Sequence, residues 1–339
     1  MKSESRIFVA GHRGLVGSAL VRRLQGKGFT GLITRTRAEL DLTNESAVRK
    51  FFAEERPDYV FLAAAKVGGI LANDSFPVDF LRENLLIQNN VIREAYRNGV
   101  ERLLFLGSSC VYPKNSPQPI REEYLLAGPL EPTNRAYALA KISGIEMCWA
   151  YNRQYGTRFI AAMPTNLYGP NDNYNVHTSH VLPALIQKFH QAKLQHFRTV
   201  TIWGSGAPRR EFLFSDDAAD ACIWLMNLEE DAIGRIMRSD EPPLVNVGWG
   251  RDLSICELAH IVGEIVGADC ELVFDGSKPD GTPRKLLDTT LLDSLGWRPS
   301  TSLREGIRVT YDAYCRDVAS DSTSGHAPQN QLASHKVSI

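Results

Sequence analysis

The sequence predicts an α/β protein built on a doubly wound parallel sheet of the Rossmann type, with a smaller C-terminal α/β domain. Its 339 residues suit one large domain with a companion, because a single core rarely organises so long a chain. In the first half, short apolar segments alternate with helix patterns, as parallel strands and crossover helices do. Near the start, three glycines spaced G-x-x-G-x-x-G separate a strand pattern from a helix pattern, which is typical of dinucleotide-binding turns.

Apolar segments predict the parallel strands of the first half. The segment 58–65 is a continuous apolar run, as expected of a strand buried on both faces. The predicted strands are residues 6–10, 32–34, 58–65, 102–107 and 158–163. Helix patterns follow the first strand up to about residue 25, and occupy residues 77–98 and 136–154.

After residue 170 the alternation weakens, which predicts a second region. Its expected strands are residues 200–203, 211–214, 244–248 and 271–274, and its expected helices are residues 183–194, 254–266 and 302–315, with a further helix from 216. We expect residues 1–170 to bind the dinucleotide, with segments near 211–250 returning to that domain, and 171–317 mainly to bind substrate. Residues 318–339 are polar without periodicity, which predicts a disordered tail.

Composition excludes several classes of protein. With a formal net charge of −1, the chain lacks the overall positive charge of a nucleic-acid-binding protein. None of the six cysteines forms a CxxC pair, so neither a metal site nor a disulfide framework is indicated. No apolar run approaches the length of a membrane span, and the first residues lack a secretory h-region. We therefore expect a cytoplasmic protein without a membrane partner.

The glycine turn predicts how a pyrophosphate would be held. Gly11 is expected to adopt a backbone conformation barred to other residues, and Gly17 to let the helix pack on the strand. Gly14 would let the backbone approach the phosphates, which the N-terminus of the following helix attracts. A glycine-rich turn without a ligand is the alternative. The predicted contacts in this turn are Gly11, His12, Arg13, Gly14, Leu15, Val16 and Gly17.

The residues after the second strand predict the type of dinucleotide. Where an NAD site would carry an acid for the ribose hydroxyls, the chain has Arg35, Thr36 and Arg37. An arginine there pairs with a 2′-phosphate, so NADP(H) is favoured over NAD(H). Arg13 is placed to close over the same group, and Asp41 to accept from the adenine amino group. The alternative is a solvated arginine pair on a loop.

Tyr137 and Lys141 are four residues apart in a predicted helix, so their side chains share one face. A cation beside a phenol lowers the tyrosine pKa, which would make Tyr137 a proton donor or acceptor for a carbonyl/alcohol pair. Ser108 follows the strand at 102–107, at the edge where ligands bind, and is placed to hydrogen-bond the same carbonyl oxygen. A solvated Lys141 beside a partly buried Tyr137 is the alternative.

Together these motifs resemble the extended short-chain dehydrogenase/reductase superfamily. Five strings narrow the resemblance to the GDP-L-fucose synthase family, whose members are GDP-4-keto-6-deoxy-D-mannose 3,5-epimerase-4-reductases. These strings are residues 10–17, 63–70, 107–113, 163–170 and 278–285, and the similarity extends from about residue 6 to 314. The resemblance implies NADPH as cofactor, a GDP-sugar as substrate and GDP-L-fucose as product. It also suggests a homodimer, with the helices at 77–98 and 136–154 pairing across a two-fold axis.

The resemblance implies catalytic roles for five residues. Ser108, Tyr137 and Lys141 match the reduction site, with Lys141 also holding the nicotinamide ribose. Cys110 and His180 match the epimerisation residues, as base and acid respectively. The chemistry agrees, because the 4-keto group acidifies C3 and C5, and each inversion needs a base on one face and an acid on the other. Without the resemblance, Cys110 reads as a small buried hydrophobe and His180 as a polar loop residue.

The resemblance also implies contacts with both ligands. Besides the glycine turn, Arg37, Asp41, Lys141 and His180, we expect the cofactor to contact Leu42, Leu106, Gly107, Pro164, Thr165, Asn166 and Leu167. For the GDP-sugar, the expected contacts are Ser108, Lys188, Trp203, Arg210 and Asp280. Lys188 stands where the family pattern has an arginine, which keeps the charge but loses the forked geometry.

Three other functions remain open from the sequence. A related enzyme acting on a 3,6-dideoxy GDP-sugar, of the GDP-L-colitose type, would use the same residues. An NAD-dependent nucleotide-sugar epimerase or dehydratase would retain its cofactor, and Arg37 argues against it. A non-catalytic dinucleotide-sensing module would not need Ser108, Tyr137 and Lys141 together.

Overall fold

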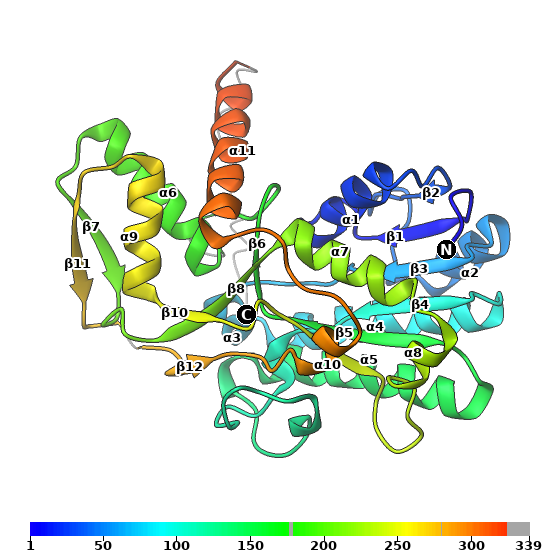
Figure 1. Cartoon of the computed structure of the whole chain (residues 1–339). Coiled ribbons are helices and arrows are strands. Elements are labelled where there is room, and N and C mark those ends of the chain that lie inside the picture. The colour runs from blue at the N-terminus through cyan, green and yellow to red at the C-terminus, as the bar shows by residue number, and fades with distance from the viewer. Residues whose placement is uncertain (176–178, 279, 324–339) are drawn as a thin grey trace, which may run out of the picture.

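The computed structural model describes residues 1–175, 179–278 and 280–323 (Figure 1). A six-stranded parallel sheet forms the centre of the N-terminal region. Its strands, in spatial order, are β2 (Leu32–Ile33), β1 (Ile7–Ala10), β3 (Tyr59–Leu62), β4 (Arg102–Leu106), β5 (Phe159–Pro164) and β9 (Leu244–Val247). The chain places β2 on one side of β1 and β3 on the other, and such a reversal opens a ligand crevice at the carboxyl ends of the strands. The predicted doubly wound sheet is confirmed.

Helices cover both faces of this sheet (Figure 1). One face carries α1 (Leu15–Gly26) and α7 (Ser215–Met226), and the other carries α2 (Glu45–Glu55), α4 (Pro77–Arg97) and α5 (Arg135–Tyr155). In β1, Ile7 and Val9 belong to the first core, whereas Phe8 and Ala10 belong to the second. Successive strand side chains point to opposite faces, which is why all four positions of this doubly covered strand are apolar.

A second region has its own core and lies beside the central sheet (Figure 1). It contains α6 (Val181–Gln195), α9 (Ile255–Val266) and the parallel pair β7 (Thr199–Trp203) and β11 (Glu271–Asp275). The sequence fixes the start of α9 through a capping box, because Ser254 Oγ accepts from Glu257 N at 3.1 Å and the Glu257 carboxylate accepts from Ser254 N at 2.7 Å.

A third sheet is centred on β8 (Arg209–Phe214). Its other strands are β6 (Asn166–Tyr168), β10 (Asp252–Ser254) and β12 (Arg284–Lys285). The segment 211–214 was expected to return to the first domain, but its strand pairs here rather than in the central sheet. The helix that follows, α7, does return and packs against α1.

Several elements differ from the sequence predictions. Helix α2 was not predicted, although Asn44 marks its start by accepting from Ala47 N at 3.1 Å. Short helices also appear: α3 (Ile70–Ser75), α8 (Glu230–Gly234), α10 (Thr290–Ser294), and the 3₁₀ turns η1 (Ser109–Val111), η2 (Glu122–Tyr124) and η3 (Pro132–Asn134).

The last helix, α11 (Leu303–Thr323), extends beyond its predicted end at residue 315, so residues 318–323 are helical rather than part of a disordered tail. The rest of that predicted tail, 324–339, and Pro279 of the 278–285 loop lie outside the described residues. Across the ranges described, no helix combines the length and apolar character needed to cross a bilayer.

Candidate active site

A cavity of about 1220 Å³ opens at the carboxyl ends of the central strands and reaches into the second region. Sites for a single small ligand usually measure about 300–1,000 Å³, so this volume suits two ligands together. The predicted site residues that line it are Gly11, Gly14, Leu15, Val16, Gly17, Arg37, Asp41, Leu42, Leu106, Gly107, Ser108, Cys110, Tyr137, Lys141, Pro164, Thr165, Asn166, Leu167, His180, Trp203, Arg210 and Asp280.

Three predicted site residues are not part of the cavity wall. His12 and Arg13 lie in the glycine turn, where Arg13 is exposed at the surface. Lys188 adjoins the cavity, because its Nζ lies 5.7 Å from the centre of the Trp203 ring. That Nζ also donates to Thr201 O at 2.8 Å, so it is held by the backbone of β7.

The glycine turn has the geometry of a phosphate-binding loop. Gly11 has φ +85°, and a Cβ there would lie 2.7 Å from Ala64 N. A Cβ on Gly17 would lie 2.0 Å from Gly11 O, so protein packing alone requires glycine at both positions. A Cβ on Gly14 would meet only Gly11 O, at 3.5 Å. Packing does not require Gly14, which lines the cavity at the N-terminus of α1, so the turn fits a pyrophosphate there.

The two arginines after β2 differ in their surroundings, although both line the cavity. Arg35 forms an ion pair with Glu55 and lies 5.7 Å from the centre of the Phe51 ring. Arg37 is 76% exposed, and its Nη2 lies 3.6 Å from Glu83 Oε2. The guanidinium of Arg37 is therefore the freer of the two to pair with a phosphate.

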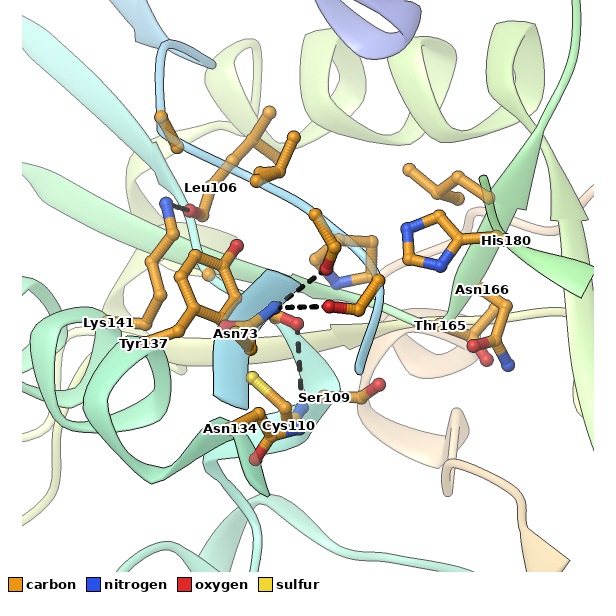
Figure 2. Close-up of a pocket in the computed structure, with 18 of the residues that line it drawn as sticks. Asn73, Leu106, Ser109, Cys110, Asn134, Tyr137, Lys141, Thr165, Asn166 and His180 are labelled. Carbon is orange, nitrogen blue, oxygen red and sulfur yellow. Dashed lines mark hydrogen bonds between the residues drawn. The ribbon is translucent and has the colours of Figure 1, made fainter. Parts of the chain in front are cut away.

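Tyr137 and Lys141 lie next to Leu106 at the end of β4 (Figure 2), and Ser108 follows that strand in the chain. Ser108 caps the turn η1 and accepts from Cys110 N at 3.5 Å. Tyr137 and Lys141 project from the first two turns of α5, as their spacing predicts. Lys141 is buried, and its Nζ donates to Leu106 O at 2.7 Å and lies 5.8 Å from the centre of the Tyr137 ring. All three residues line the cavity, and the Tyr137 phenol forms a hydrogen bond with Ser108.

The pKa of Tyr137 is shifted in the direction opposite to the one that the sequence predicts. Burial, reinforced by the negative charge of an ionised Cys110, raises the pKa of Tyr137 well above its ordinary value, and a hydrogen bond with Ser108 offsets part of the rise. The Lys141 ammonium is directed to Leu106 O, so it does not hold the phenol pKa down. Tyr137 therefore keeps its proton throughout the neutral range, which suits a proton donor.

Lys141 gives a testable pH dependence. Burial lowers its pKa to about 8, an effect that Cys110 partly opposes. The ammonium is the charged form below this pH, so we expect kcat/KM for reduction to fall about tenfold per pH unit above 8, because kcat/KM reports pKa values of the free enzyme. Steady-state rates from pH 6.5 to 9.5 test this, with circular dichroism as the control for folding. A rate that stays constant to pH 9.5 would show that the charge of Lys141 is not required.

Cys110 and His180 line the same cavity, and both lie in the field of Lys285. Burial raises the pKa of Cys110, while Lys285, a Ser108 hydrogen bond and Lys141 lower it. Burial and then Lys285 lower the pKa of His180. In the free protein the neutral thiol and the neutral imidazole are thus favoured, rather than the thiolate and imidazolium that the sequence predicts. Moving one proton from Cys110 to His180 would produce the predicted pair.

Lys285 itself was missed by the sequence analysis, although it belongs to the string at 278–285. It is contributed by β12, whose pairing with β8 sets Lys285 opposite Arg210. Burial lowers the pKa of Lys285. No local pattern links it to Cys110, 175 positions earlier in the chain, so only the fold reveals this cation.

Glu211 was also missed, and it holds two residues of the cavity wall from behind. It is fully buried, and its carboxylate accepts from the backbone N–H groups of residues 249–250 at 2.6 and 2.7 Å, and from Leu287 N at 3.0 Å. Its carbonyl oxygen accepts from Thr165 Oγ1 at 3.3 Å and from Asn166 Nδ2 at 2.8 Å. Glu211 thus ties one segment of the cavity wall, Thr165 and Asn166, to β8, and it is not itself part of that wall.

The far end of the cavity carries the residues predicted for the nucleotide. The Trp203 ring is 66% exposed, with the Nζ atoms of Lys188 and Lys278 5.7 and 5.6 Å from its centre. Asp280 accepts from Ser205 N at 2.9 Å and from Ser205 Oγ at 2.6 Å, which closes the turn after β7. A contact of Asp280 with a ribose stays a prediction.

Comparison with known proteins identifies the family of the chain. A family model described as the NAD dependent epimerase/dehydratase family matches residues 7–238. GDP-L-fucose synthase 1 of Arabidopsis thaliana is 55% identical over 314 residues, covering 93% of this chain and 94% of that protein. GDP-L-fucose synthase of Escherichia coli is 52% identical over 311 residues, covering 91% of this chain and 96% of that protein.

Solved structures agree with the fold. A GDP-mannoheptose C4 reductase from Campylobacter jejuni with NADP bound has a TM-score of 0.84 at 43% identity, covering 93% of this chain and 99% of the other. A GDP-L-fucose synthetase from Naegleria fowleri bound to NADP has a TM-score of 0.83 at 28% identity, covering 94% and 96%. The chain therefore belongs to the NAD dependent epimerase/dehydratase family and, within it, to the GDP-L-fucose synthases.

Proposed function

We propose that this protein converts GDP-4-keto-6-deoxy-D-mannose to GDP-L-fucose by 3,5-epimerisation followed by NADPH-dependent reduction at C4. The observation that carries the proposal is that one cavity holds two sets of groups. Ser108, Tyr137 and Lys141 are suited to reduction, and Cys110 and His180 are suited to proton transfer. A plain reductase needs only the first set. The relatives named GDP-L-fucose synthase, at 52–56% identity, support the same substrate.

The cofactor is held by the glycine turn and by Arg37. The backbone amides at the start of α1 receive the pyrophosphate, and Arg37 receives the 2′-phosphate. The loop at 164–167 and Lys141 form the nicotinamide end of the cavity wall. When bound, NADPH supplies the hydride for C4. Solved relatives whose titles name NADP support this choice of cofactor.

Epimerisation uses the acidity that the C4 ketone gives to C3 and C5. Ser108 and Tyr137 hydrogen-bond O4 and stabilise the negative charge that develops there when a proton leaves. Cys110 is the base, and Lys285 and Lys141 stabilise its thiolate. His180 is the acid that returns a proton to the opposite face. Before each inversion one proton moves from Cys110 to His180. The thiolate then takes the sugar proton and the imidazolium returns one, so both groups are neutral again when the inversion is complete.

Reduction uses the same oxygen. Once both centres are inverted, Tyr137 donates its proton to O4 as the alcohol forms, which its raised pKa permits because the phenol remains protonated. Ser108 keeps O4 in position through both stages. Lys141 fixes the end of β4 against α5 through its hydrogen bond to Leu106.

Substituting Arg37 tests the choice of cofactor. We expect Arg37→Glu to raise the KM for NADPH by about 10–100-fold, because a charge-assisted hydrogen bond to the 2′-phosphate contributes about 1.5–3 kcal/mol. The KM for NADH should change little, since NADH has no 2′-phosphate. The matched control is Arg56→Glu, a change on the loop before β3 outside the cavity wall. If Arg37→Glu leaves the NADPH:NADH preference unchanged, Arg37 does not read the phosphate.

Product analysis tests the whole proposal. The protein is incubated in D₂O with NADPH and GDP-4-keto-6-deoxy-D-mannose, and the product is identified by NMR. We expect GDP-L-fucose carrying deuterium at C3 and C5. A product without deuterium at either carbon would identify a reductase without epimerase activity, and no product at all would overturn the assignment.

A second candidate is the related reaction on a 3,6-dideoxy GDP-sugar. A GDP-L-colitose synthase of Yersinia pseudotuberculosis is 36% identical over 317 residues, below the 52–56% of several GDP-L-fucose synthases. The difference favours the fucose pathway, and a panel of both keto-sugars distinguishes the two. A UDP-glucose 4-epimerase of Thermus thermophilus in complex with NAD, at 24% identity, shares the fold, and Arg37 argues against NAD as the cofactor here.

We propose further that the protein is a cytoplasmic homodimer in which residues 171–317 mainly bind the GDP-sugar. Among the described residues all six cysteines are free, which fits a reducing compartment. α4 and α5 pack side by side and expose Tyr96 and Tyr155, whose rings stack at 4.3 Å. Pairing of these helices between two copies would cover the aromatic surface. Light scattering should give about twice the chain mass of 37.7 kDa.

A further inference from the structure

The cavity wall contains a buried hydrogen-bond acceptor that no described group satisfies. Asn73, on α3, is 6% exposed and lines the cavity. Its Nδ2 donates to Gly68 O at 2.7 Å and to Gly69 O at 3.0 Å (Figure 2). Its Oδ1 is buried and has no hydrogen-bond partner among the described residues. Such an orphaned acceptor costs about 1–3 kcal/mol unless a ligand satisfies it.

The orientation of this amide is fixed by its own hydrogen bonds. Gly68 O and Gly69 O can only accept, so the NH₂ group must face them. Turning the amide over would set its oxygen against two carbonyl oxygens and lose both bonds. Oδ1 therefore points away from the loop, and its orphaned state does not arise from a wrong assignment of N and O.

A second orphaned acceptor lies on an element that contacts α3. Asn134 Oδ1 is also buried without a partner among the described residues, and Asn134 lines the cavity. It belongs to the turn η3, which contacts α3 and leads directly into α5, and it lies three residues before Tyr137 in the chain. Both acceptors therefore belong to elements that meet beside the reduction site. Figure 2 shows Asn73 drawn among Tyr137, Cys110 and His180.

We propose that Asn73 Oδ1 accepts a hydrogen bond from a ring hydroxyl of the hexose and so makes Asn73 a specificity-determining residue. This inference rests on the proposed function, because the keto-sugar carries hydroxyl donors at C2 and C3 beside the C4 ketone. Oxygen atoms of the diphosphate and of O4 cannot donate to it. A 3-deoxy sugar lacks one of the two donors. If the C3 hydroxyl is the one recognised, this sugar leaves Asn73 Oδ1 unsatisfied. A site built to bind a hydroxyl rejects an analogue that lacks it.

The test compares the wild type and one variant on three sugar substrates. NADPH oxidation is measured for the wild type and for Asn73→Ala with the 4-keto sugar and with its 2-deoxy and 3-deoxy analogues. We expect the variant to lose about 10–100-fold in kcat/KM on the full substrate. On the analogue that lacks the recognised hydroxyl, wild type and variant should agree within about threefold, since the interaction is already absent. If Asn73→Ala is unstable, Asn73→Ser is measured in its place, because its hydroxyl keeps a donor for the loop carbonyls. We expect the same pattern of rates from it.

Asn84 supplies the matched control. It holds the same loop, with Oδ1 accepting from Lys66 N at 2.9 Å and Nδ2 donating to Lys66 O and Phe80 O at 3.0 and 2.7 Å. All its bonds are internal and it is outside the cavity wall. We expect Asn84→Ala to lower the rates on all three substrates by one common factor.

Three results would overturn the inference. Asn73→Ala could lower the rates on all three sugars by the same factor, as a structural role predicts. It could instead raise only the Kd for NADPH, which would assign the acceptor to the carboxamide of the cofactor. It could also leave every rate unchanged. In each case an active wild type keeps the proposed function, whereas a wild type inactive on all three sugars would overturn both.

Discussion

Replacing Tyr137 with phenylalanine is expected to lower kcat for NADPH oxidation by about 10²–10⁴-fold, the usual contribution of a positioned general acid. The phenol is buried beside Ser108, and its raised pKa keeps the proton available until O4 becomes basic. Phenylalanine preserves the ring that packs edge-on against Phe80, with ring centroids 6.2 Å apart, so the fold should survive. Stopped-flow absorbance at 340 nm measures the change.

The same variant separates the two stages. Without the proton donor, epimerisation is still supported by Cys110, His180 and the hydrogen bond from Ser108 to O4. We therefore expect Tyr137→Phe to incorporate solvent deuterium at C3 and C5 more rapidly than it consumes NADPH. The control is Tyr124→Phe in η2, which is outside the cavity wall and should leave both rates unchanged. Unchanged NADPH oxidation in Tyr137→Phe would remove Tyr137 from the mechanism.

Substitution of Cys110 is expected to abolish epimerisation, with deuterium exchange falling by about 10²–10⁴-fold in Cys110→Ala. The thiolate removes the proton from C3 and C5, and alanine cannot replace it. NADPH oxidation should become slow and limited to sugar that has not been inverted. Reversed-phase separation of the sugar nucleotides, with NMR of each product, measures both outcomes.

His180→Asn is expected to behave differently from Cys110→Ala, because loss of the acid affects the return of the proton whereas loss of the base affects its removal. In this variant Cys110 must lose its proton to solvent rather than to His180 before it can act as the base. With no acid on the opposite face, the proton that it removes from the sugar is then returned on the same side. Deuterium should then enter C3 and C5 without inversion. If His180→Asn blocks exchange and Cys110→Ala permits it, the two roles are reversed, which the protonation states of the free protein would then explain.

The glycine turn shows how much local sequence decides. The spacing of Gly11, Gly14 and Gly17 predicts a tight turn, an open approach to the cavity and close helix packing, and the structure has each of them. These constraints arise within seven residues of chain, where backbone geometry leaves few choices. The strand at 6–10 is equally local, because a doubly covered strand must be apolar throughout.

The pKa of Tyr137 shows what local sequence leaves out. The four-residue spacing correctly predicts that Tyr137 and Lys141 share a helical face, and it suggests that the cation stabilises the phenolate. Burial of both groups outweighs their pairing, and the ammonium donates to Leu106 O instead. Burial depends on what packs over the helix, and the sequence of the helix does not contain that information.

The sequence by itself determined the parallel sheet, the crossover helices other than α2, the glycine turn and many of the residues that line the cavity. These follow from periodicity, from backbone geometry and from strings of residues close together in the chain. Only the tertiary structure decided the charge states of Cys110, His180 and Tyr137, the approach of Lys285 to the first two, and the orphaned oxygen of Asn73. Each of these depends on desolvation and on distances between segments far apart in sequence, and both are set only when the chain packs.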